Sequence, residues 1–347
     1  KHPAENFPEY YNNGNINEYE VLPRLLLGDY LENQFNAYIK AARKSGIAVD
    51  VLLETDVIDI KSSPDGSFQI LTDSLKIQTD LVVICTGHSW GKTHENKTEN
   101  WYDSPYPPSK FTGESNFPAA VRGTSLTAVD AVKTISRLNG VYRENSDGSL
   151  QYILNENSPD FKIDMFSKGG YLPALRFHSE DDSFSADWTM SLDEIFEYKK
   201  NHGGFVDLDF VFNEKFKHPL KLKDPKFYEQ IKDLNIEEFV SKMMKIRKNK
   251  DSFDLFTEEF REAEKSIEKN KSVSWKETLS AFSYAVNYPA KHFSAEDMLR
   301  LRKTLMPLIT IIIASLPQSS YRELIALHDA GLINLISVDE ESRVERS

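Results

Sequence analysis

Two short apolar runs, each ending at a turn of small residues, constrain the fold of this chain more than any other feature. One covers residues 81–85 and is followed by Thr86 and Gly87, and the other covers residues 119–121 and is followed by Arg122 and Gly123. Buried parallel strands read as continuous apolar runs, and ligands bind beyond their carboxyl ends. We therefore expect two buried parallel strands whose turns face a ligand site.

The second turn leads into an amphipathic stretch. Residues 126–138 carry Val129, Val132, Ile135 and Leu138 at helical spacing. The free amides at the start of a helix form a favourable site for phosphate. Two strand-ending turns in one chain predict a protein built around two nucleotides.

Composition narrows the class of protein. The 347 residues include 54 acidic and 42 basic side chains, a net charge of −12, which disfavours nucleic acid as a partner. The single cysteine, Cys85, excludes an internal disulfide and a CxxC redox pair. The longest apolar run, 305–316, is too short to span a bilayer and predicts a buried helix. No signal peptide is visible, so we expect a globular cytoplasmic protein without membrane association, its oligomeric state open.

Hydrophobic periodicity and turn residues predict the remaining elements. We expect a helix over 25–44, a strand over 47–53, a hairpin of 57–61 with 67–72, and a third short strand over 74–78. A loop-rich connection with several aromatic residues covers 89–118. Further strands are expected over 161–166 and 332–338, and a mostly helical, highly charged region over 191–330.

Five segments in this order resemble a known family. They are Leu22-Pro23-Arg24 with Gly28-Asp29-Tyr30-Leu31, Val83-Ile84-Cys85-Thr86-Gly87-His88, Tyr102-Asp103-Ser104-Pro105-Tyr106-Pro107, Gly123-Thr124-Ser125-Leu126-Thr127-Ala128-Val129-Asp130, and Ser167-Lys168-Gly169-Gly170-Tyr171-Leu172-Pro173. The chain resembles the bacterial FAD/NAD(P)-binding protein family, which is related to flavin-dependent N-hydroxylating monooxygenases.

The resemblance implies an α/β fold of the two-dinucleotide-binding flavoprotein type, present in part. Residues 1–112 would form a partial FAD-binding domain with a β-meander and a connecting loop. Residues 113–184 would form an inserted Rossmann-like NAD(P)-binding unit, 185–330 a mainly helical insertion, and 331–347 a returning strand and tail. The family opens with a strand and a G-x-G-x-x-G turn that has no counterpart before Lys1. We therefore expect weak FAD binding by this chain alone.

The same resemblance implies which residues lie near the flavin nucleotide. Thr86 and Gly87 would let the backbone approach it, because glycine has no side chain to block the contact. His88 would bond the cofactor or simply cap the turn. Val57 lies on the strand that presents backbone groups to adenine, and Arg24 would pair with a phosphate or ring oxygen. A strand-ending turn and an ordinary surface arginine are the alternatives.

The second turn is expected to bind a nicotinamide nucleotide. Gly123, Ser125 and Ala128 occupy the three glycine positions of G-x-G-x-x-G. Serine at the second position adds a side chain whose hydroxyl can donate to a phosphate oxygen. Thr124, Leu126 and Thr127 complete the cofactor-binding turn. Arg122 would need an acceptor if it were buried, and a phosphate would be one.

Lys168 follows the next strand, where a basic residue favours the 2′-phosphate of NADP over the free ribose of NAD. The alternative is a solvated lysine in a glycine-rich loop. The histidines are scattered without metal-ligand spacing, so we predict no metal site. No G-x-S-x-G elbow and no Walker turn occur, and the pattern identifies no catalytic residue.

These observations favour an FAD/NAD(P)-binding oxidoreductase-like protein. Hydride would pass from NADPH to flavin, and electrons would pass on to oxygen or a small-molecule substrate. The competing hypothesis is a non-catalytic nucleotide-binding or scaffold protein that keeps the fold without redox activity. Ser125 and the charged helical insertion favour this second hypothesis, so whether the chain is an enzyme stays open.

Overall fold

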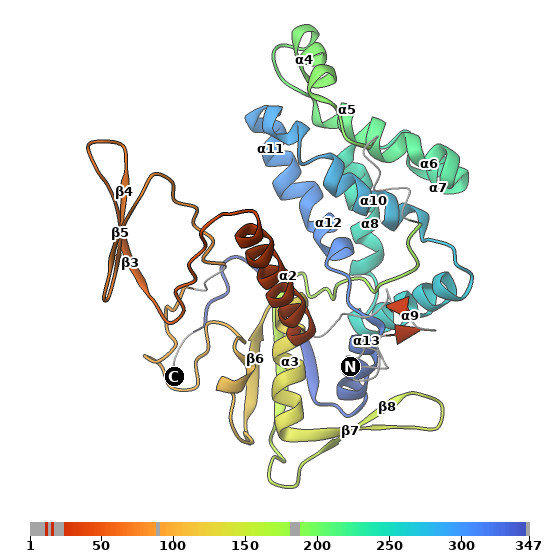
Figure 1. Cartoon of the computed structure of the whole chain (residues 1–347). Helices are drawn as coiled ribbons and strands as arrows, with labels where there is room; N and C mark the ends of the chain where they lie inside the picture. Colours follow the sequence, from red (N-terminus) through yellow and green to blue (C-terminus); the bar gives the residue numbers. More distant parts are fainter. Residues whose placement is uncertain (1–10, 13–14, 17–23, 88–90, 181–187, 345–347) are drawn as a thin grey trace. The chain divides into compact units, whose positions relative to one another are not determined.

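The computed structural model describes residues 11–12, 15–16, 24–87, 91–180 and 188–344. The chain divides into two compact units. The first, called here the 22–104 unit, covers Leu22–Ser104, and the second, called the main unit, combines Lys1–Val21 with Pro105–Ser347. Figure 1 shows their elements along the chain.

A three-stranded parallel sheet organises the main unit. Strands β6 (Pro118–Arg122), β9 (Lys162–Lys168) and β10 (Ile333–Val338) pair in the order β10-β9-β6. The strands predicted over 119–121, 161–166 and 332–338 are therefore confirmed in β6, β9 and β10. The main unit also holds the short antiparallel pair β1 (Tyr11–Asn12) and β2 (Asn15–Ile16).

One face of the sheet is apolar and covered by helices. The inward residues align in two rows across the three strands, Ala119 with Ile163 and Ile333, then Val121 with Met165 and Leu335. Helix α3 (Leu126–Asn139) packs Val129 and Val132 against these rows, and α13 (Gln318–Asp329) adds Leu324 and Leu327. The predicted helix over 126–138 is therefore confirmed, and the sheet has a single hydrophobic core on this side.

The two helices are also joined by charge. Glu323 on α13 forms an ion pair with Arg137 of α3, whose guanidinium lies 2.9 Å from a carboxylate oxygen of Glu323. The ammonium group of Lys133 lies 3.4 Å from the same oxygen. The opposite face of the sheet carries polar side chains on β9 and β10. There Asn334 donates a hydrogen bond of 2.8 Å to Asp164, the residue opposite it. The side-chain pattern thus alternates along each strand, as it does in a sheet with one buried face.

An antiparallel hairpin follows α3 and was not predicted. It consists of β7 (Gly140–Glu144) and β8 (Leu150–Leu154) around the turn at Gly148. The hydroxyl of Tyr152 donates to the Ser136 carbonyl at 2.6 Å, and burial raises the pKa of Tyr152 to about 12. The turn residues at 145–148 were the available signal, because Asp and Gly between two β-branched or aromatic runs indicate a hairpin.

Most of the chain between the second and third sheet strands is helical, as predicted. The helices are α4 (Leu192–Asn201), α5 (Leu208–Phe212), α6 (His218–Lys223), α7 (Pro225–Ile231), α8 (Ile236–Lys248), α9 (Ser252–Glu268), α10 (Ser274–Ala285), α11 (Ala295–Arg300) and α12 (Met306–Ile313). One-turn π-helical segments at Asn213–Lys217 and Leu301–Leu305 join α5 to α6 and α11 to α12.

This helical region has its own hydrophobic core. Its centre is a cluster of aromatic rings in which Phe212 lies 4.9 Å from Phe216, 5.5 Å from Phe239 and 5.7 Å from Phe282. The predicted buried helix over 305–316 is confirmed in α12, whose Leu308, Ile309 and Ile312 join the same cluster. Ring pairs at these separations add to the stability that area burial supplies.

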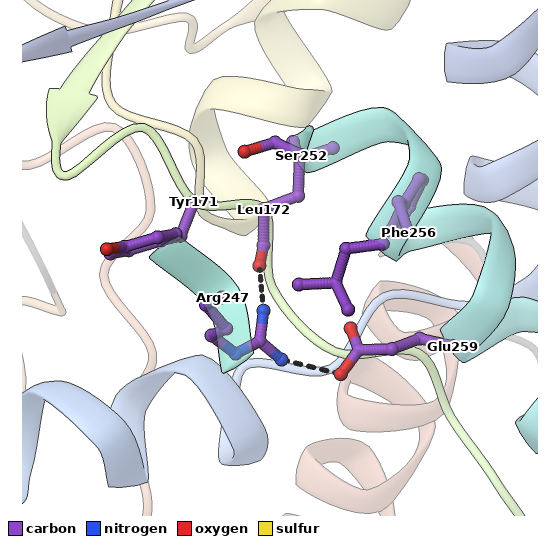
Figure 2. A pocket seen from close by; sticks show the side chains of 7 residues that line it. Tyr171, Leu172, Arg247, Ser252, Phe256 and Glu259 are labelled. Carbon is purple, nitrogen blue, oxygen red and sulfur yellow. Dashed lines mark hydrogen bonds and ion pairs between the residues drawn. The ribbon is translucent and has the colours of Figure 1, made fainter. Parts of the chain in front are cut away.

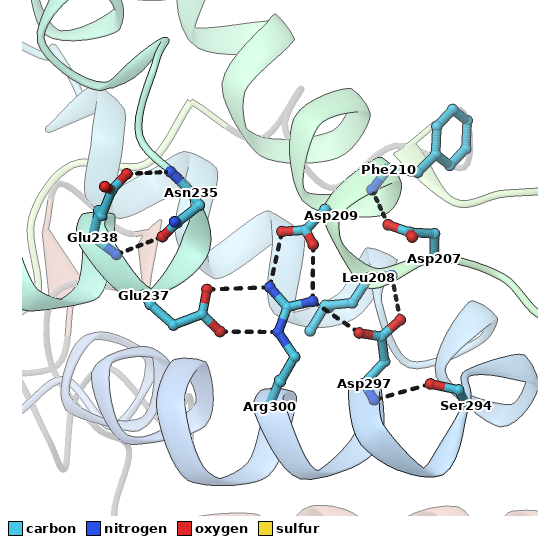
Figure 3. Close-up of polar contacts among 10 residues, drawn as sticks. All are labelled: Asp207, Leu208, Asp209, Phe210, Asn235, Glu237, Glu238, Ser294, Asp297 and Arg300. Carbon is cyan, nitrogen blue, oxygen red and sulfur yellow. Dashed lines mark hydrogen bonds and ion pairs between the residues drawn. The ribbon is translucent and has the colours of Figure 1, made fainter.

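Arg300 joins three helices of this region at the surface. Its guanidinium donates to Asp209 of α5 at 2.8 Å, to Glu237 of α8 at 2.9 Å and to Asp297 of its own helix at 2.9 Å (Figure 3). The hydrogen bond from Arg300 lowers the pKa of Glu237. Three carboxylates on one fork-shaped cation fix the ends of these helices relative to one another.

The 22–104 unit contains α2 (Arg24–Lys44) and an antiparallel sheet of β3 (Val57–Ser62), β4 (Phe68–Thr72) and β5 (Lys76–Thr79). The predicted helix and meander are confirmed. Within the described part of this unit, no apolar side chain is buried. The apolar face of α2 is exposed at Leu27, Leu31 and Phe35.

Two predicted strands of this unit are wrong. In the described chain, residues 47–53 and 81–85 form no helix or strand and belong to no sheet, and Val83 is 74% exposed. The apolar run 81–85 predicts a buried parallel strand, but among the described residues no strand pairs with it. An extended segment needs a neighbour on at least one side to bond its N–H and C=O groups and cover its side chains. The segment 81–85 is apolar, but it is not buried as predicted.

The alternation in the parallel sheet makes a prediction about stability. Replacing Ile163, fully buried on the central strand, with Ala should lower the free energy of unfolding of the main unit by about 3–4 kcal/mol. The matched variant Ile336→Ala, on the outward face of β10, should cost less than about 1 kcal/mol. Urea denaturation followed by circular dichroism measures both values. Equal losses would contradict the assignment of the two faces.

Candidate functional site at the carboxyl edge of the parallel sheet

The three parallel strands end at one edge of the sheet. Arg122 at the end of β6 is in register with Phe166 of β9, and Val338 at the end of β10 is in register with Lys168. The loops after these strands therefore start side by side, and this brings the predicted turn 123–127 and Lys168 to the same edge. In open α/β sheets this is the edge at which ligands bind.

The β6–α3 turn joins a strand to a helix, as the sequence predicted. Gly123 has φ +105°, a conformation that favours glycine, and its N–H donates to the Phe166 carbonyl at 2.7 Å. A Cβ at Gly123 would lie 3.7 Å from the Cβ of Ala128, an ordinary contact. Backbone conformation, not lack of space, therefore requires the glycine. Ala128 at the third position is buried against the sheet.

The start of α3 is open to a ligand. Ser125 is the N-cap residue, its side chain makes no capping hydrogen bond, and the first helical turn has no acidic residue. Ser125 and Leu126 are exposed and Thr127 is half-buried. The first amides of the helix and its positive dipole end are consequently not neutralised by the helix's own side chains.

Thr124 has a different role from the predicted one. Its side chain is buried, and its hydroxyl donates a hydrogen bond of 2.6 Å to the Tyr171 carbonyl in the loop after β9. It thus ties the two strand-ending loops together from inside. The side chain of Arg122, expected to need an acceptor if buried, is exposed because it lies on the outward face of β6.

Lys168 lies at the predicted edge, but it has a partner that the sequence interpretation missed. Its ammonium group is 2.5 Å from a carboxylate oxygen of Glu340, two residues after β10. Both side chains are largely exposed, at 67% and 83%, and the bond from Lys168 lowers the pKa of Glu340. The signal was available: acidic residues follow the last predicted strand, and parallel strands end at one edge.

The loop after β9 is also held by the helical region. Figure 2 shows a pocket where Arg247 of α8 and Ser252 of α9 lie beside Tyr171 and Leu172. Ser252 donates a hydrogen bond of 2.5 Å to the Gly170 carbonyl, and Arg247 approaches the Leu172 carbonyl at 3.5 Å. The pocket leaves no room for a water molecule, so it is a packed joint and not a ligand site.

The residues predicted to contact FAD are in the 22–104 unit. Thr86 and Gly87 are exposed at the end of the unpaired segment, and Gly87 has φ +71°. Val57 begins β3 and is exposed, and its backbone pairs with Thr72. Arg24 is the first residue of α2, but its side chain and the whole of His88 lie outside the described residues.

A single carboxylate organises the aromatic segment before residue 105. Asp103 accepts hydrogen bonds from the backbone N–H groups of Thr93, His94 and Glu95 at 2.6–2.9 Å, and from the Trp101 indole at 2.9 Å. The bond from the Glu95 N–H and its companions hold the pKa of Asp103 well below its usual range. Trp101 is therefore fixed by Asp103, a residue that sequence reasoning had not singled out.

A second cleft lies at the opposite edge of the sheet. It has a volume of about 690 Å³ and is lined by the β7–β8 turn, α9 and α13, with Phe260 stacked on Tyr321 at 3.8 Å. The hairpin follows the end of α3, and α13 ends just before β10 begins, so this cleft opens at the amino ends of the strands. It is separate from the carboxyl edge that carries the predicted nucleotide residues.

In the part of the chain that the structure describes, no group of three or more His, Cys, Asp or Glu side chains could hold a metal ion. No helix there is long and apolar enough to cross a membrane.

Two family models match the chain. Residues 2–89 match the model described as FAD-NAD(P)-binding, and residues 191–313 match the YdhS-like middle domain. The first match covers α2 and the meander, and the second covers the helical region from α4 to α12. The β6–α3 turn lies outside both matches.

The chain is similar to a protein of Escherichia coli (strain K12) with the printed name "Uncharacterized protein YdhS". The two are 26% identical over 337 residues, which cover 95% of this chain and 62% of that protein. The chain thus spans less than two thirds of the length of this relative.

The conformation of the β6–α3 turn predicts losses of stability of different size for two neighbouring substitutions. Gly123→Ala should lower the free energy of unfolding by about 1–2 kcal/mol, because alanine is strained at φ +105°. Ser125→Ala should cost less than about 0.5 kcal/mol, since its hydroxyl makes no capping bond to lose. Thermal unfolding of the two variants beside the unmodified protein checks this. A larger loss at Ser125 would show that the hydroxyl does cap the helix.

The lowered pKa of Asp103 predicts that the segment it holds, which includes Trp101, loses its order in acid. The folded pKa lies below the unfolded value, so the carboxylate stabilises this segment above about pH 4 and the effect is lost as the pH falls further. Fluorescence of Trp101, taken as the difference from Trp101→Phe, should stay constant from pH 7 to 5 and change well below pH 4. Asp103→Asn should show the changed signal already at pH 7, whereas Glu99→Gln, the charge-matched control, should not.

Proposed function

We propose that this chain is part of a dinucleotide-binding redox protein whose β6–α3 turn binds the pyrophosphate of a nicotinamide dinucleotide. The observation that carries the proposal is the open N-terminus of α3 after Gly123 at φ +105°, at the carboxyl edge of a parallel sheet. The match of residues 2–89 to an FAD-NAD(P)-binding model supports the same class of ligand.

The residues at this edge fit a phosphate group. The glycine backbone at position 123 lets the turn bend toward the helix start, and the first amides of α3 are not bonded by a cap. The Ser125 hydroxyl is exposed beside them and can donate a further hydrogen bond. Leu126 and Thr127 contribute backbone amides and one hydroxyl at the first helical positions.

The proposal includes FAD because residues 2–89 match the FAD-NAD(P)-binding model. The chemistry supplied by such a cofactor pair, when both are bound, is transfer of a hydride from NADPH to flavin and of electrons onward to oxygen or a small molecule. The described residues 24–87 place Thr86 and Gly87 on an unpaired segment. We therefore assign no flavin contact to individual side chains.

Lys168 supports NADP as the preferred nucleotide over NAD. It is the last residue of β9, the second strand of the unit, where the adenosine ribose of a bound dinucleotide would lie. A 2′-phosphate would have to replace Glu340 as the partner of the ammonium group. That exchange is easy, because an ion pair between two exposed side chains is screened by water and contributes little.

The proposal predicts a selectivity that two single substitutions move in opposite directions. The unmodified protein should bind NADP roughly fivefold to tenfold more tightly than NAD. Lys168→Gln should bring the two dissociation constants together, and Glu340→Gln should widen the ratio by about twofold to fivefold, because the competing carboxylate is gone. Isothermal titration calorimetry at low and high salt measures the ratio, which salt should shrink.

Failure to bind either nucleotide would contradict the proposed function itself. Equal binding of NADP and NAD by the unmodified protein would instead leave the nucleotide site and remove the role of Lys168.

The alternative function is a nucleotide-binding or scaffold protein without redox activity. The specific observation in its favour is the helical region from Leu192 to Ile313, which has a core of its own and exceeds the sheet in size. Absorbance distinguishes the two. Bleaching of the oxidised-flavin band when NADPH is added to the full-length protein with FAD supports the redox function, whereas a full-length protein that FAD cannot reconstitute supports the scaffold.

A further inference from the structure

Three consecutive carbonyl groups in the loop after β9 each accept a hydrogen bond from a side chain of a different element. The Gly170 carbonyl accepts from Ser252, the Tyr171 carbonyl from Thr124, and the Leu172 carbonyl from Arg247. The distances are 2.5, 2.6 and 3.5 Å. Two of the three donors belong to the helical region, at the end of α8 and the start of α9.

The donors are themselves fixed. Arg247 is 6% exposed and pairs with Glu259 of α9 at 2.5 Å, and Lys276 of α10 reaches the same carboxylate oxygen at 3.1 Å. Ser252 is the first residue of α9, directly after the N-cap Asp251. The buried, ion-paired arginine is held by Glu259, and Ser252 cannot turn away without leaving the buried Gly170 without this bond to its carbonyl.

The loop needs such support because of its own sequence. Gly169 and Gly170 both have positive φ, at +77° and +65°, and two adjacent glycines have the largest backbone freedom of any dipeptide. Lys168 immediately precedes them and lies at the end of β9. The Gly170 N–H also donates to the Ser167 carbonyl at 3.2 Å, and the three carbonyl bonds add contacts with distant elements to this local bond.

We propose that the helical region fixes the Gly169–Leu172 loop and thereby sets the position of Lys168, so that Ser252 and Arg247 are positioning residues for nucleotide selectivity. This inference rests on the proposed function for its selectivity part. The fixing of the loop itself rests only on the hydrogen bonds. The helical region would then act on the nucleotide site without touching the nucleotide.

The test uses Ser252→Ala, which removes one carbonyl bond and no buried charge. Hydrogen exchange followed by mass spectrometry should show exchange at the amides of 169–172 accelerated at least threefold. The ratio of the dissociation constants for NAD and NADP should fall from fivefold or more to about twofold or less. Ser252→Thr keeps a hydroxyl and should restore both values.

Ser283→Ala is the matched control. Ser283 is also half-buried on a helix, and its hydroxyl donates to the Ser280 carbonyl at 2.6 Å, away from the loop. This variant should leave exchange at 169–172 and the selectivity ratio unchanged. A general loss of stability would weaken both nucleotides alike, so a shift of the ratio reports the position of Lys168 and not the overall fold.

The outcomes separate the two claims. Unchanged exchange at 169–172 in Ser252→Ala overturns the fixing of the loop, whatever the nucleotide result. Faster exchange with an unchanged ratio overturns the role in selectivity. If the unmodified protein binds neither nucleotide, the proposed function and the selectivity role both fail, while faster exchange in the variant still establishes that the helical region fixes the loop.

Discussion

The pairing of β9 with strands on both of its sides is the constraint on which the main unit depends. Because β6 and β10 both run parallel to β9, the two connections between these strands must cross from one edge of the sheet to the other, and every loop that follows a strand begins at the carboxyl edge. Residues far apart in the sequence, such as Gly123, Lys168 and Glu340, become neighbours for this reason alone. The buried rows of the sheet then hold α3 and α13 on one face, which leaves the start of α3 pointing to that edge.

The helical region contacts the parallel-sheet part of the main unit through the apolar side of α9, where Phe253 and Phe256 join the core of the sheet, and through the loop after β9. Arg247, Glu259 and Lys276 form a buried ion network beside the loop after β9, and the adjacent pocket is filled by side chains. Networks of this kind are strongly destabilised when one partner is removed, because the remaining charge stays buried. The joint therefore links the packing of a large helical insertion to the shape of a short glycine loop.

The elements that local pattern determines were predictable from the sequence. The periodicity of Val129 and Val132 indicated α3, and the apolar runs around Val121 and Ile333 indicated two strands of the sheet. The turn between β6 and α3 was predicted from its small residues, whereas the positive φ of Gly123 was not. The position of the candidate site was predictable in the same way. The β6–α3 turn and Lys168 lie at one edge of the sheet, because parallel strands all end at the same edge.

What the pattern could not show depends on partners distant in sequence. An apolar run such as 81–85 signals a strand, but only a neighbouring strand makes it one, and the described residues supply none. Thr124 is predicted to contact the cofactor as part of the turn 123–127, whereas its hydroxyl bonds a carbonyl 47 positions away. Ser252 and Arg247 had no local signature, since their role comes entirely from the fold.

The exposed apolar face of the 22–104 unit has a thermodynamic consequence. The heat-capacity increment of unfolding grows with the apolar surface that becomes hydrated, and the buried apolar side chains of the described chain all belong to the main unit. Unfolding of residues 22–104 would therefore contribute little to that increment or to the denaturant dependence. A calorimetric trace of the whole chain would give the heat-capacity step of a protein about one quarter shorter than its sequence.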